Sequence, residues 1–246
     1  MDNAEAHRFA REKGSSKPLF RTVRGAAIPY MKLVYALKIE GAENIPETGP
    51  VIVAPNHKSF WDAFFVAAAT KRPIRFMGKD ELFEGRTGKL LIRLGAFPVR
   101  RGASDAEAIE TARQILLDGG LLALFPEGTR VRDPTILGKP HKGAARLALE
   151  TGATIVPCAI TGTEKLFAGP LPRPGRVRVA FAEPIPPPEA GAEATPEAAA
   201  ELVDERLWPE VERTHQRLLS HPGLIAAGLA ALGVGAGVAA RRRRKR

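Results

Sequence analysis

The pattern of apolar and polar positions in the central part of the chain switches repeatedly between short strand-like runs and longer helical stretches. Apolar runs typical of buried strands occur at residues 51–54, 74–77, 96–99, 121–125, 154–160 and 177–181. Helical patterns occur between them at residues 62–70, 80–94, 104–118 and 143–151. Ser104 with Glu107 is typical of a capping box that begins the third of these helices. This order of elements predicts an α/β fold with a mixed, largely parallel central sheet flanked by helices.

The first forty residues have a different pattern. Residues 1–16 are polar and charged without an apolar period, which predicts a flexible N-terminus. From residue 19 to residue 37, apolar side chains recur mostly at helical spacing with basic residues between them. Pro29 is predicted to divide this stretch into two short helices, because proline removes a backbone hydrogen bond. We expect residues 17–40 to be an amphipathic helical membrane foot, although a helix packed on the domain would show the same stripe.

The C-terminal part begins with a Pro-rich linker after residue 183 and then returns to a helical pattern. Thr195 and Pro196 are typical of the N-cap and first turn of a helix that reaches toward residue 219, with a kink at Pro209. Residues 223–240 are apolar and rich in Gly and Ala, and they barely reach the length that spans a bilayer. Since glycine weakens helices and small residues add little transfer energy, a spanning, re-entrant, surface-lying or disordered tail all remain open.

The net charge of +10 on this 246-residue chain is concentrated at its two ends. Residues 1–40 carry eight basic and four acidic side chains and residues 241–246 are all basic, so residues 41–240 hold 23 charges of each sign. A neutral central region makes nucleic acid the weaker explanation of the charge. Basic ends beside apolar sequence favour an anionic lipid surface, although a basic tail can also be simply solvated. The single cysteine, Cys158, excludes an internal disulfide framework.

The segment Asn56–Asp62 directly follows the first of the central strands. The neutral imidazole of His57 can take a proton from an alcohol as that alcohol attacks a carbonyl carbon, and a nearby carboxylate can stabilise the imidazolium that forms. A turn between His57 and Asp62 can bring these two groups together. The alternative is structural: Ser59 caps the following helix, Asp62 completes its capping box, and His57 is an ordinary loop residue.

A second polar block, Phe125–Arg130, also follows a predicted strand. The guanidinium of Arg130 can bind a phosphate, and the Thr129 hydroxyl and Gly128 backbone can add donors. Glu127 can accept a hydrogen bond from a substrate hydroxyl or orient the arginine. A solvated Pro-Gly turn with an ion pair is the alternative interpretation.

Two further blocks are weaker, and two other kinds of site find no support. Gly95–Arg101 ends a strand with two arginines that can add phosphate-binding charge, and Ile155–Ile160 is an apolar run typical of a core strand. The chain lacks a Gly-x-Ser-x-Gly elbow, which disfavours a serine hydrolase. Its five histidines are scattered without the spacing of metal ligands.

In this fixed order, the four blocks resemble those of the glycerolipid acyltransferase family, which includes the 1-acylglycerol-3-phosphate acyltransferases. The resemblance covers residues 50–165, and the Asn-His-x-x-x-x-Asp and Phe-Pro-Glu-Gly-Thr-Arg blocks match residue for residue. It implies that His57 is the general base and Asp62 its partner. It also implies that the acceptor is bound by the following residues: Lys79, Arg101, Glu127, Gly128, Thr129 and Arg130. The sequence departs from many members of the family at Pro98, which affects the fine shape of the acceptor pocket rather than the reaction.

The resemblance implies direct acyl transfer from acyl-CoA or acyl carrier protein to lysophosphatidic acid, giving phosphatidic acid without a cofactor, a metal or a covalent enzyme intermediate. Glycerol 3-phosphate or another lysophospholipid is the alternative acceptor, and a non-catalytic membrane-binding protein is the alternative of a different class. We expect an acyltransferase domain over residues 41–220 and a tail over 221–246. The expected location is the cytoplasmic face of the cell membrane, peripheral or monotopic, with membrane lipid as partner and no nucleic acid.

Overall fold

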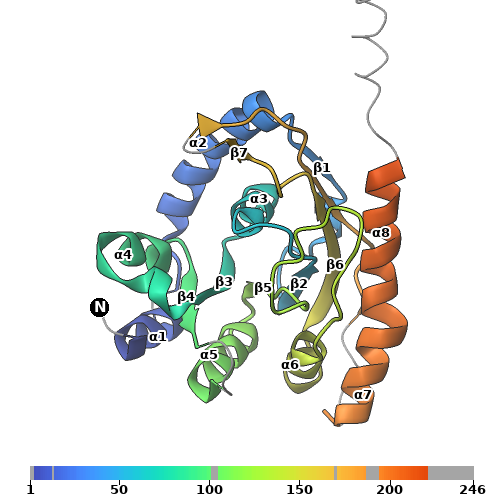
Figure 1. Ribbon diagram of the computed structural model, residues 1–246. Coiled ribbons are helices and arrows are strands. Elements are labelled where there is room, and N and C mark those ends of the chain that lie inside the picture. The colour runs from blue at the N-terminus through green and yellow to red at the C-terminus, as the bar shows by residue number, and fades with distance from the viewer. Residues whose placement is uncertain (1–2, 13, 101–104, 169–170, 187–193, 221–246) are drawn as a thin grey trace, which may run out of the picture.

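The computed structural model describes the whole chain except residues 1–2, 13, 101–104, 169–170, 187–193 and 221–246 (Figure 1). Its strands are β1 (Lys38–Glu40), β2 (Val51–Pro55), β3 (Ile74–Lys79), β4 (Ala96–Val99), β5 (Leu121–Ala123), β6 (Thr154–Thr161), β7 (Phe167–Ala168), β8 (Leu171–Pro172) and β9 (Arg178–Phe181). Its α-helices are α1 (Asn3–Glu12), α2 (Lys17–Tyr35), α3 (Asp62–Ala69), α4 (Gly85–Arg93), α5 (Ala106–Leu117), α6 (Gly143–Thr151), α7 (Pro196–Glu201) and α8 (Trp208–Ser220). Short 3-10 helices span Ala42–Asn44 and Asp80–Phe83, and a π-helical turn spans Leu202–Leu207.

Seven strands form one mixed sheet in the order β1-β9-β6-β2-β5-β3-β4, and β7 pairs with β8 in a separate antiparallel hairpin. Strands β2 to β6 run parallel to one another, whereas β9 pairs antiparallel with β6 and parallel with β1. The predicted α/β fold with a mixed, largely parallel sheet is therefore confirmed. The parallel arrangement brings the ends of β2, β5 and β6 to the same edge.

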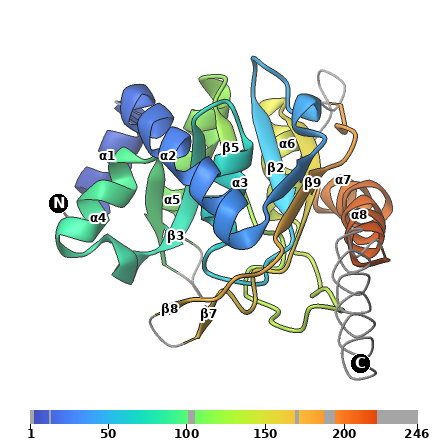
Figure 2. The same cartoon turned by 90° about the horizontal axis from the view of Figure 1, so that it is seen from above.

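Helices cover both faces of the sheet (Figures 1 and 2). Because successive side chains of a strand point to opposite faces, β2 contributes to two separate cores. Val51 and Val53 pack with side chains of α2 and α3, whereas Ile52 and Ala54 pack with those of α5, α6 and the C-terminal helices. All four of these β2 residues are fully buried. Burial on both faces explains why the strand is an unbroken apolar run rather than an alternating one.

The N-terminal segment differs from its prediction in three respects. The flexible start predicted over residues 1–16 is wrong for α1, whose small side chains and His7 are buried against the domain. The division at Pro29 is also wrong, because α2 continues through it as one helix. Both ends of α2 are anchored by buried aromatics, Phe20 and Tyr35, so the loss of one backbone hydrogen bond is tolerated. The helix ends at Tyr35, and residues 38–40 of the predicted helical segment form strand β1.

Three boundaries in the middle of the chain also differ. Helix α5 is capped by Asp105, whose carboxylate accepts from the Ala108 backbone N–H at 3.2 Å, rather than by the predicted Ser104. The helix predicted over 80–94 is a 3-10 turn followed by α4, because Gly85, the first residue of α4, adopts a left-handed conformation with φ +65°. Strand β5 stops at Ala123, because the chain enters a turn in which the Phe125 carbonyl accepts from the Gly128 N–H at 3.0 Å.

The C-terminal helices begin as predicted, with Thr195 as N-cap and Pro196 in the first turn. The interruption predicted at Pro209 takes the form of the π-helical turn that immediately precedes α8. Most of the predicted linker and the whole 223–240 segment lie outside the described residues. Among the helices that the structure does describe, none combines the length and the apolar character needed to cross a bilayer.

Candidate active site

The candidate catalytic side chains lie where three neighbouring strands end. The chain leaves β2 into His57, leaves β5 into Glu127, and leaves β6 into Thr163. Because β2 lies between β5 and β6 and is parallel to both, these segments meet at one edge although they are far apart in the sequence. Asn56 ties two of them together, since its side chain donates to the Ile160 carbonyl at 3.1 Å and accepts from the Ile160 N–H at 2.7 Å.

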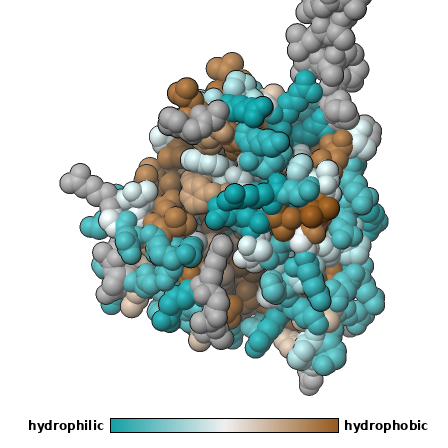
Figure 3. All heavy atoms as spheres, viewed as in Figure 1, coloured by the Kyte–Doolittle hydropathy of each residue, from teal (hydrophilic) through white to brown (hydrophobic). Residues whose placement is uncertain are grey.

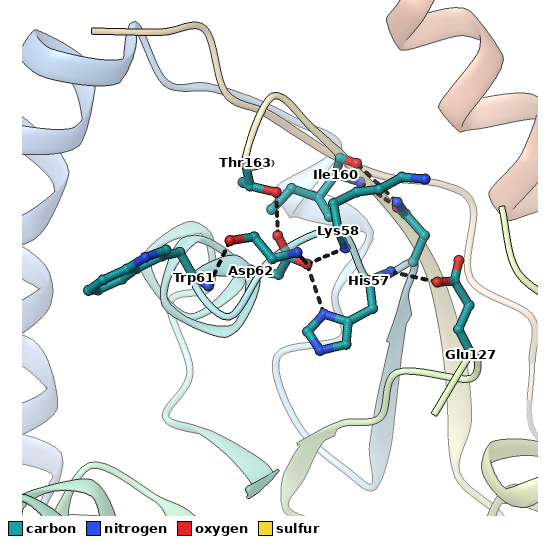
Figure 4. Close-up of polar contacts among 9 residues, drawn as sticks. His57, Lys58, Trp61, Asp62, Glu127, Ile160 and Thr163 are labelled. Atoms are coloured by element: carbon teal, nitrogen blue, oxygen red, sulfur yellow. Dashed lines mark hydrogen bonds and ion pairs between the residues drawn. The ribbon is translucent and has the colours of Figure 1, made fainter. Parts of the chain in front are cut away.

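The contact predicted between His57 and Asp62 is present (Figure 4). The imidazole Nδ1 lies 2.8 Å from Asp62 Oδ2. A carboxylate can only accept, so Nδ1 carries the hydrogen of this bond and Nε2 is left as the acceptor nitrogen of the ring. Asp62 is fully buried and His57 is 7% exposed, so the pair is nearly closed to solvent except where the ring lines a cavity. This arrangement provides a base with a fixed tautomer.

Asp62 is held by more than the histidine. Its Oδ2 accepts from the backbone N–H groups of Lys58 at 2.6 Å and Ser59 at 2.7 Å, and its Oδ1 accepts from the Thr163 hydroxyl. The bond to Ser59 is one half of the capping box that the structural alternative predicted. The same carboxylate therefore closes the turn and orients the imidazole. The other half of the predicted capping box is absent, since the Ser59 hydroxyl accepts from the Trp61 N–H at 3.3 Å and α3 begins without a side-chain cap.

The loop after β5 fixes the backbone of His57 from both sides. Glu127 Oε2 accepts from the His57 N–H at 3.4 Å, and the Val131 N–H donates to the His57 carbonyl at 2.8 Å. The Phe125 ring stacks on the imidazole with a centroid distance of 4.2 Å. The two sequence blocks that carry the family resemblance are thus in direct contact, because Glu127 and Phe125 of the second block hold the backbone and the imidazole ring of His57 in the first.

Three residues predicted to bind the acceptor have different surroundings from those expected. Glu127 is only 3% exposed and faces the backbone of His57, and burial raises the pKa of its carboxyl. The Gly128 N–H is bonded to the Phe125 carbonyl and is not a free donor. Gly128 has φ +63°, and a β-carbon there would lie 3.0 Å from the His141 ring, so its role is conformational. Thr129 is exposed and does not line the cavity beside His57.

Lys58 is a buried cation directly behind the catalytic pair. It is 1% exposed, and its Nζ donates to the backbone carbonyls of Asp133, at 2.8 Å, and of Ile136. Burial lowers the pKa of this ammonium, while the nearby carboxylate of Glu127 opposes the shift. Lys58 thereby anchors the loop after Arg130 beneath the site.

A cavity of about 190 Å³ opens beside the imidazole. Its lining combines apolar side chains with His57, Lys79 and Arg130, so three of the predicted site residues share one space. Lys79 also forms an ion pair with Glu81, which holds the pKa of that exposed carboxyl at about 2 through hydrogen bonding. Arg130 is exposed on the loop after β5 and has no ion pair among the described residues.

The remaining basic residue predicted to bind the acceptor, Arg101, lies outside the described residues. The residue before it, Arg100, directly follows β4, so this block also ends at the edge that carries His57. Its backbone N–H donates to Asp105 at 2.8 Å and its guanidinium is largely exposed.

A second cavity, of about 130 Å³, continues the first toward α2. The two share part of their lining, namely Ala63, Phe64, Phe76, Leu91 and Ala96. The second is lined almost entirely by apolar groups from α2, α3 and α4, and Arg24 in its wall donates to the Ala68 carbonyl at 3.0 Å. Together they form an apolar groove that runs from the imidazole toward the exposed surface of α2.

Thr163, Phe125 and Asn56 also contact the catalytic segment, although the sequence alone indicates no role for them. Asn56 and Phe125 each begin one of the two blocks that match the family, whereas the only signal for Thr163 is its position just after a core strand. In the part of the chain that the structure describes, no group of three or more His, Cys, Asp or Glu side chains is arranged to hold a metal ion.

Comparison with known proteins finds similar sequences and a similar solved structure. The profile of the acyltransferase family matches residues 36–161. A chloroplastic 1-acyl-sn-glycerol-3-phosphate acyltransferase of Arabidopsis thaliana is 32% identical over 61% of this chain and 44% of its own length. The protein of that activity from Bacillus subtilis (strain 168) is 28% identical over 61% of this chain and 73% of its own.

The crystal structure of the 1-acyl-sn-glycerophosphate acyltransferase PlsC from Thermotoga maritima superposes with a TM-score of 0.65 at 25% identity, covering 90% of this chain and 85% of that one. The fold is therefore shared nearly throughout. Against the first curated relatives the match is shorter, since this chain spans 44% of the Arabidopsis protein and 54% of a similarly named protein from Chlamydomonas reinhardtii.

Proposed function

This chain belongs to the acyltransferase family, and from that premise we propose that it acylates the free hydroxyl of lysophosphatidic acid to give phosphatidic acid. The proposed donor is a thioester, either acyl-CoA or acyl carrier protein. The observation that carries the proposal is the His57–Asp62 pair, whose imidazole lines a cavity together with Arg130 and Lys79. The names of the Arabidopsis and Bacillus relatives, and of the Thermotoga structure, support the same acceptor class.

In the proposed reaction, His57 Nε2 takes the proton from the acceptor hydroxyl as its oxygen attacks the thioester carbonyl. The tetrahedral intermediate collapses by breaking its C–S bond, and the imidazolium returns the proton to the leaving thiolate. Asp62 stays ionised, holds Nδ1–H and stabilises the imidazolium between these steps. The balance is one ester formed, one thioester broken and one thiol released.

The acceptor's phosphate is proposed to bind Arg130 and Lys79, with Arg101 adding charge. A guanidinium that is free of internal ion pairs is suited to a phosphate, because its planar donors match two phosphate oxygens at once. Lys79 must exchange its bond to Glu81 for the phosphate, or share it. Glu127 and Gly128 are proposed to act indirectly. Glu127 holds the backbone of His57, and Gly128 shapes the loop that carries Arg130.

The acyl chain is proposed to lie in the apolar groove between α2, α3 and α4. A fatty chain gains about 0.8 kcal/mol for each methylene removed from water, and this groove offers few polar groups that would have to lose their own hydration. Because this cavity shares lining residues with the one beside His57, a chain seated in the groove is expected to hold its thioester carbon near the imidazole.

The enzyme is proposed to work at an anionic membrane surface, on the cytoplasmic face and without a cofactor. Exposed apolar side chains on α2, including Val23, Tyr30 and Leu33, support this, since Leu33 is 85% exposed. Apolar atoms gather at the upper left of the face that carries the site, toward α2 (Figure 3). The acceptor resides in the bilayer, so a surface-bound enzyme meets it directly.

Product analysis with purified protein tests the proposal. Acyl-CoA and acyl carrier protein are each offered with lysophosphatidic acid, glycerol 3-phosphate and lysophosphatidylcholine, and the products are identified by mass spectrometry. The proposal expects phosphatidic acid as the main product. A preference for another acceptor would show that lysophosphatidic acid is not the substrate. If the protein transfers acyl groups to none of these acceptors but still binds vesicles, a non-catalytic membrane-binding protein would be favoured.

A further inference from the structure

A cavity of about 440 Å³ lies at the edge of the sheet opposite to the catalytic pair, where β3 and β5 begin. It is bounded by the end of α1, the start of α2 and the turn between α5 and β5. Its charged lining residues are Arg11, Lys17, Arg72, Arg75, Glu47 and Asp118. Four positive and two negative side chains therefore face one space that the proposed reaction does not use.

Arg75 in β3 is the most unusual member of this group, because it is a buried guanidinium without a counter-charge. It is 6% exposed, and its Nη2 donates to the Ala10 carbonyl at 2.6 Å. Its Nε has no hydrogen-bond partner among the described residues, and no described carboxylate forms an ion pair with it. Burial lowers its pKa to about 10. A buried donor and a buried positive charge are both costly when they are left unpaired.

The three other basic residues of the lining differ in how far their donors are already used. Lys17 begins α2, whose N-cap is the neutral Ser16 and whose first turn contains no acidic residue, so no counter-charge lies at the positive end of the helix dipole. Arg11 donates to the Thr111 hydroxyl at 2.8 Å and lies 3.7 Å from Glu107. Arg72 is occupied, since its guanidinium donates to three backbone carbonyls at 2.7 to 2.9 Å. Arg75 and Lys17 are thus the residues available to bind a ligand, and Arg11 adds positive charge to the cavity.

The acidic members of the lining do not supply the missing counter-charge. Asp118 accepts from the Gln114 side chain at 3.0 Å, and neither it nor Glu47 forms an ion pair with a described residue. Only burial shifts the pKa of Arg75, so no acidic group compensates its charge from nearby.

We propose that this cavity is a second ligand site, which binds a soluble anion with a phosphate monoester group through Arg75 and Lys17. A phosphate dianion neutralises the charge of the buried guanidinium and compensates the positive charge at the start of α2. A soluble ligand is favoured over a lipid headgroup because the cavity lies at the sheet edge opposite to the acyl groove's catalytic end. Its occupancy links α1, α2 and β3, and thus stabilises the helix that lines the acyl groove.

Calorimetric titration with inorganic phosphate tests the site, in an Arg130→Ala background that removes the phosphate ligand proposed at the catalytic edge. Variants Lys17→Gln, Arg11→Gln/Lys17→Gln and Arg75→Gln are compared with Lys38→Gln, which removes an exposed charge from the far edge strand β1. We expect saturable binding that weakens about tenfold on loss of each direct ligand and is unchanged in the control. If Arg75→Gln does not fold, the two surface variants decide the outcome.

Two results would overturn the inference. One is the absence of saturable binding up to tens of millimolar phosphate, or binding that all the cavity variants retain. The other is loss of binding to phosphatidic acid vesicles, relative to phosphatidylcholine vesicles, in the same variants while phosphate binding is unchanged. Neither result bears on acyl transfer, which is measured separately and does not depend on this cavity.

Discussion

The Asp62 carboxylate accepts hydrogen bonds from the His57 imidazole, two backbone N–H groups and the Thr163 hydroxyl. The bond to His57 can be expected from the spacing of the two residues, and the bond to the Ser59 N–H from the capping box. The contact with Thr163 joins residues 101 positions apart, and it follows from the pairing of β2 with β6. A single sequence gives no direct sign of that pairing, which explains why Thr163 could not be identified in advance.

Replacement of Thr163 by Val is expected to lower kcat about tenfold with little change in KM. Valine keeps the shape of the side chain but removes a hydrogen bond to a charged group, a bond that contributes about 1.5 to 3 kcal/mol. Thr163→Ser keeps the hydroxyl and should restore most of the activity. Steady-state kinetics of the two variants separate positioning from packing, since a purely structural role would make the smaller serine at least as harmful as valine.

Replacement of Arg130 by Ala is expected to lower kcat/KM for phosphate-bearing acceptors by about ten- to a hundredfold, the range of one charge-assisted contact. Arg130→Lys should recover only part of this, because an ammonium cannot reproduce two parallel bonds. The matched control is Arg132→Ala, an exposed arginine on the same loop that does not line the cavity. Equal losses with an acceptor that lacks phosphate would rule out Arg130 as a phosphate ligand.

At the scale of elements, the core strands and the helices between them are predictable because their apolar periods are long and unambiguous. β4 and α6 have the predicted bounds, and β2 and β6 each differ by one residue at one end. The three-residue edge strand β1 has too short a pattern to be recognised. α1 was missed because its packing uses Ala6, His7 and Ala10, which are not distinctive in sequence. Tertiary contacts also override the helix-breaking tendency of Pro29, which local propensity alone predicts.

The apolar groove makes a prediction about acyl chain length. Ala67 of α3 lines the part of the groove away from His57. Ala67→Phe should fill that part and shift the preference toward shorter acyl donors, raising the short-to-long ratio of kcat/KM several-fold. Extra volume in a packed region costs about 1 to 3 kcal/mol, so the melting temperature is measured in parallel. The short-to-long ratio serves as its own control, since a general loss of stability lowers kcat/KM for both donors alike. An unchanged ratio would exclude this groove as the site of the acyl chain.

At the scale of the whole molecule, the central domain and the two ends of the chain differ in net charge. Residues 41–240 are formally neutral, and the positive charge lies in the first forty residues and the last six. α2 presents Val23, Tyr30 and Leu33 to solvent, whereas Phe20 on the same helix is buried. The sequence showed that the helix is amphipathic but could not show which of its apolar residues face the sheet.

Vesicle co-sedimentation tests the membrane account. Val23→Ser/Tyr30→Ser/Leu33→Ser should weaken binding to both neutral and anionic vesicles, because it removes exposed apolar area. Deletion of residues 221–246 should instead weaken binding to anionic vesicles only, and mainly at low salt, since each basic residue near such a surface contributes about 1 kcal/mol that salt screens. Undiminished binding after both changes would mean that the membrane-binding surface lies elsewhere on the domain.

The central claim is that the imidazole held by Asp62 is the base for acyl transfer. It is tested most directly by the turnover of His57→Ala with lysophosphatidic acid and a saturating acyl thioester, compared with wild type and with His141→Ala. His141 is exposed beside the Gly128 turn and does not line the cavity. The account predicts that His57→Ala loses at least about a hundredfold in kcat while its melting temperature stays near that of wild type, and that His141→Ala keeps its activity. A folded His57→Ala protein with near wild-type turnover would contradict it.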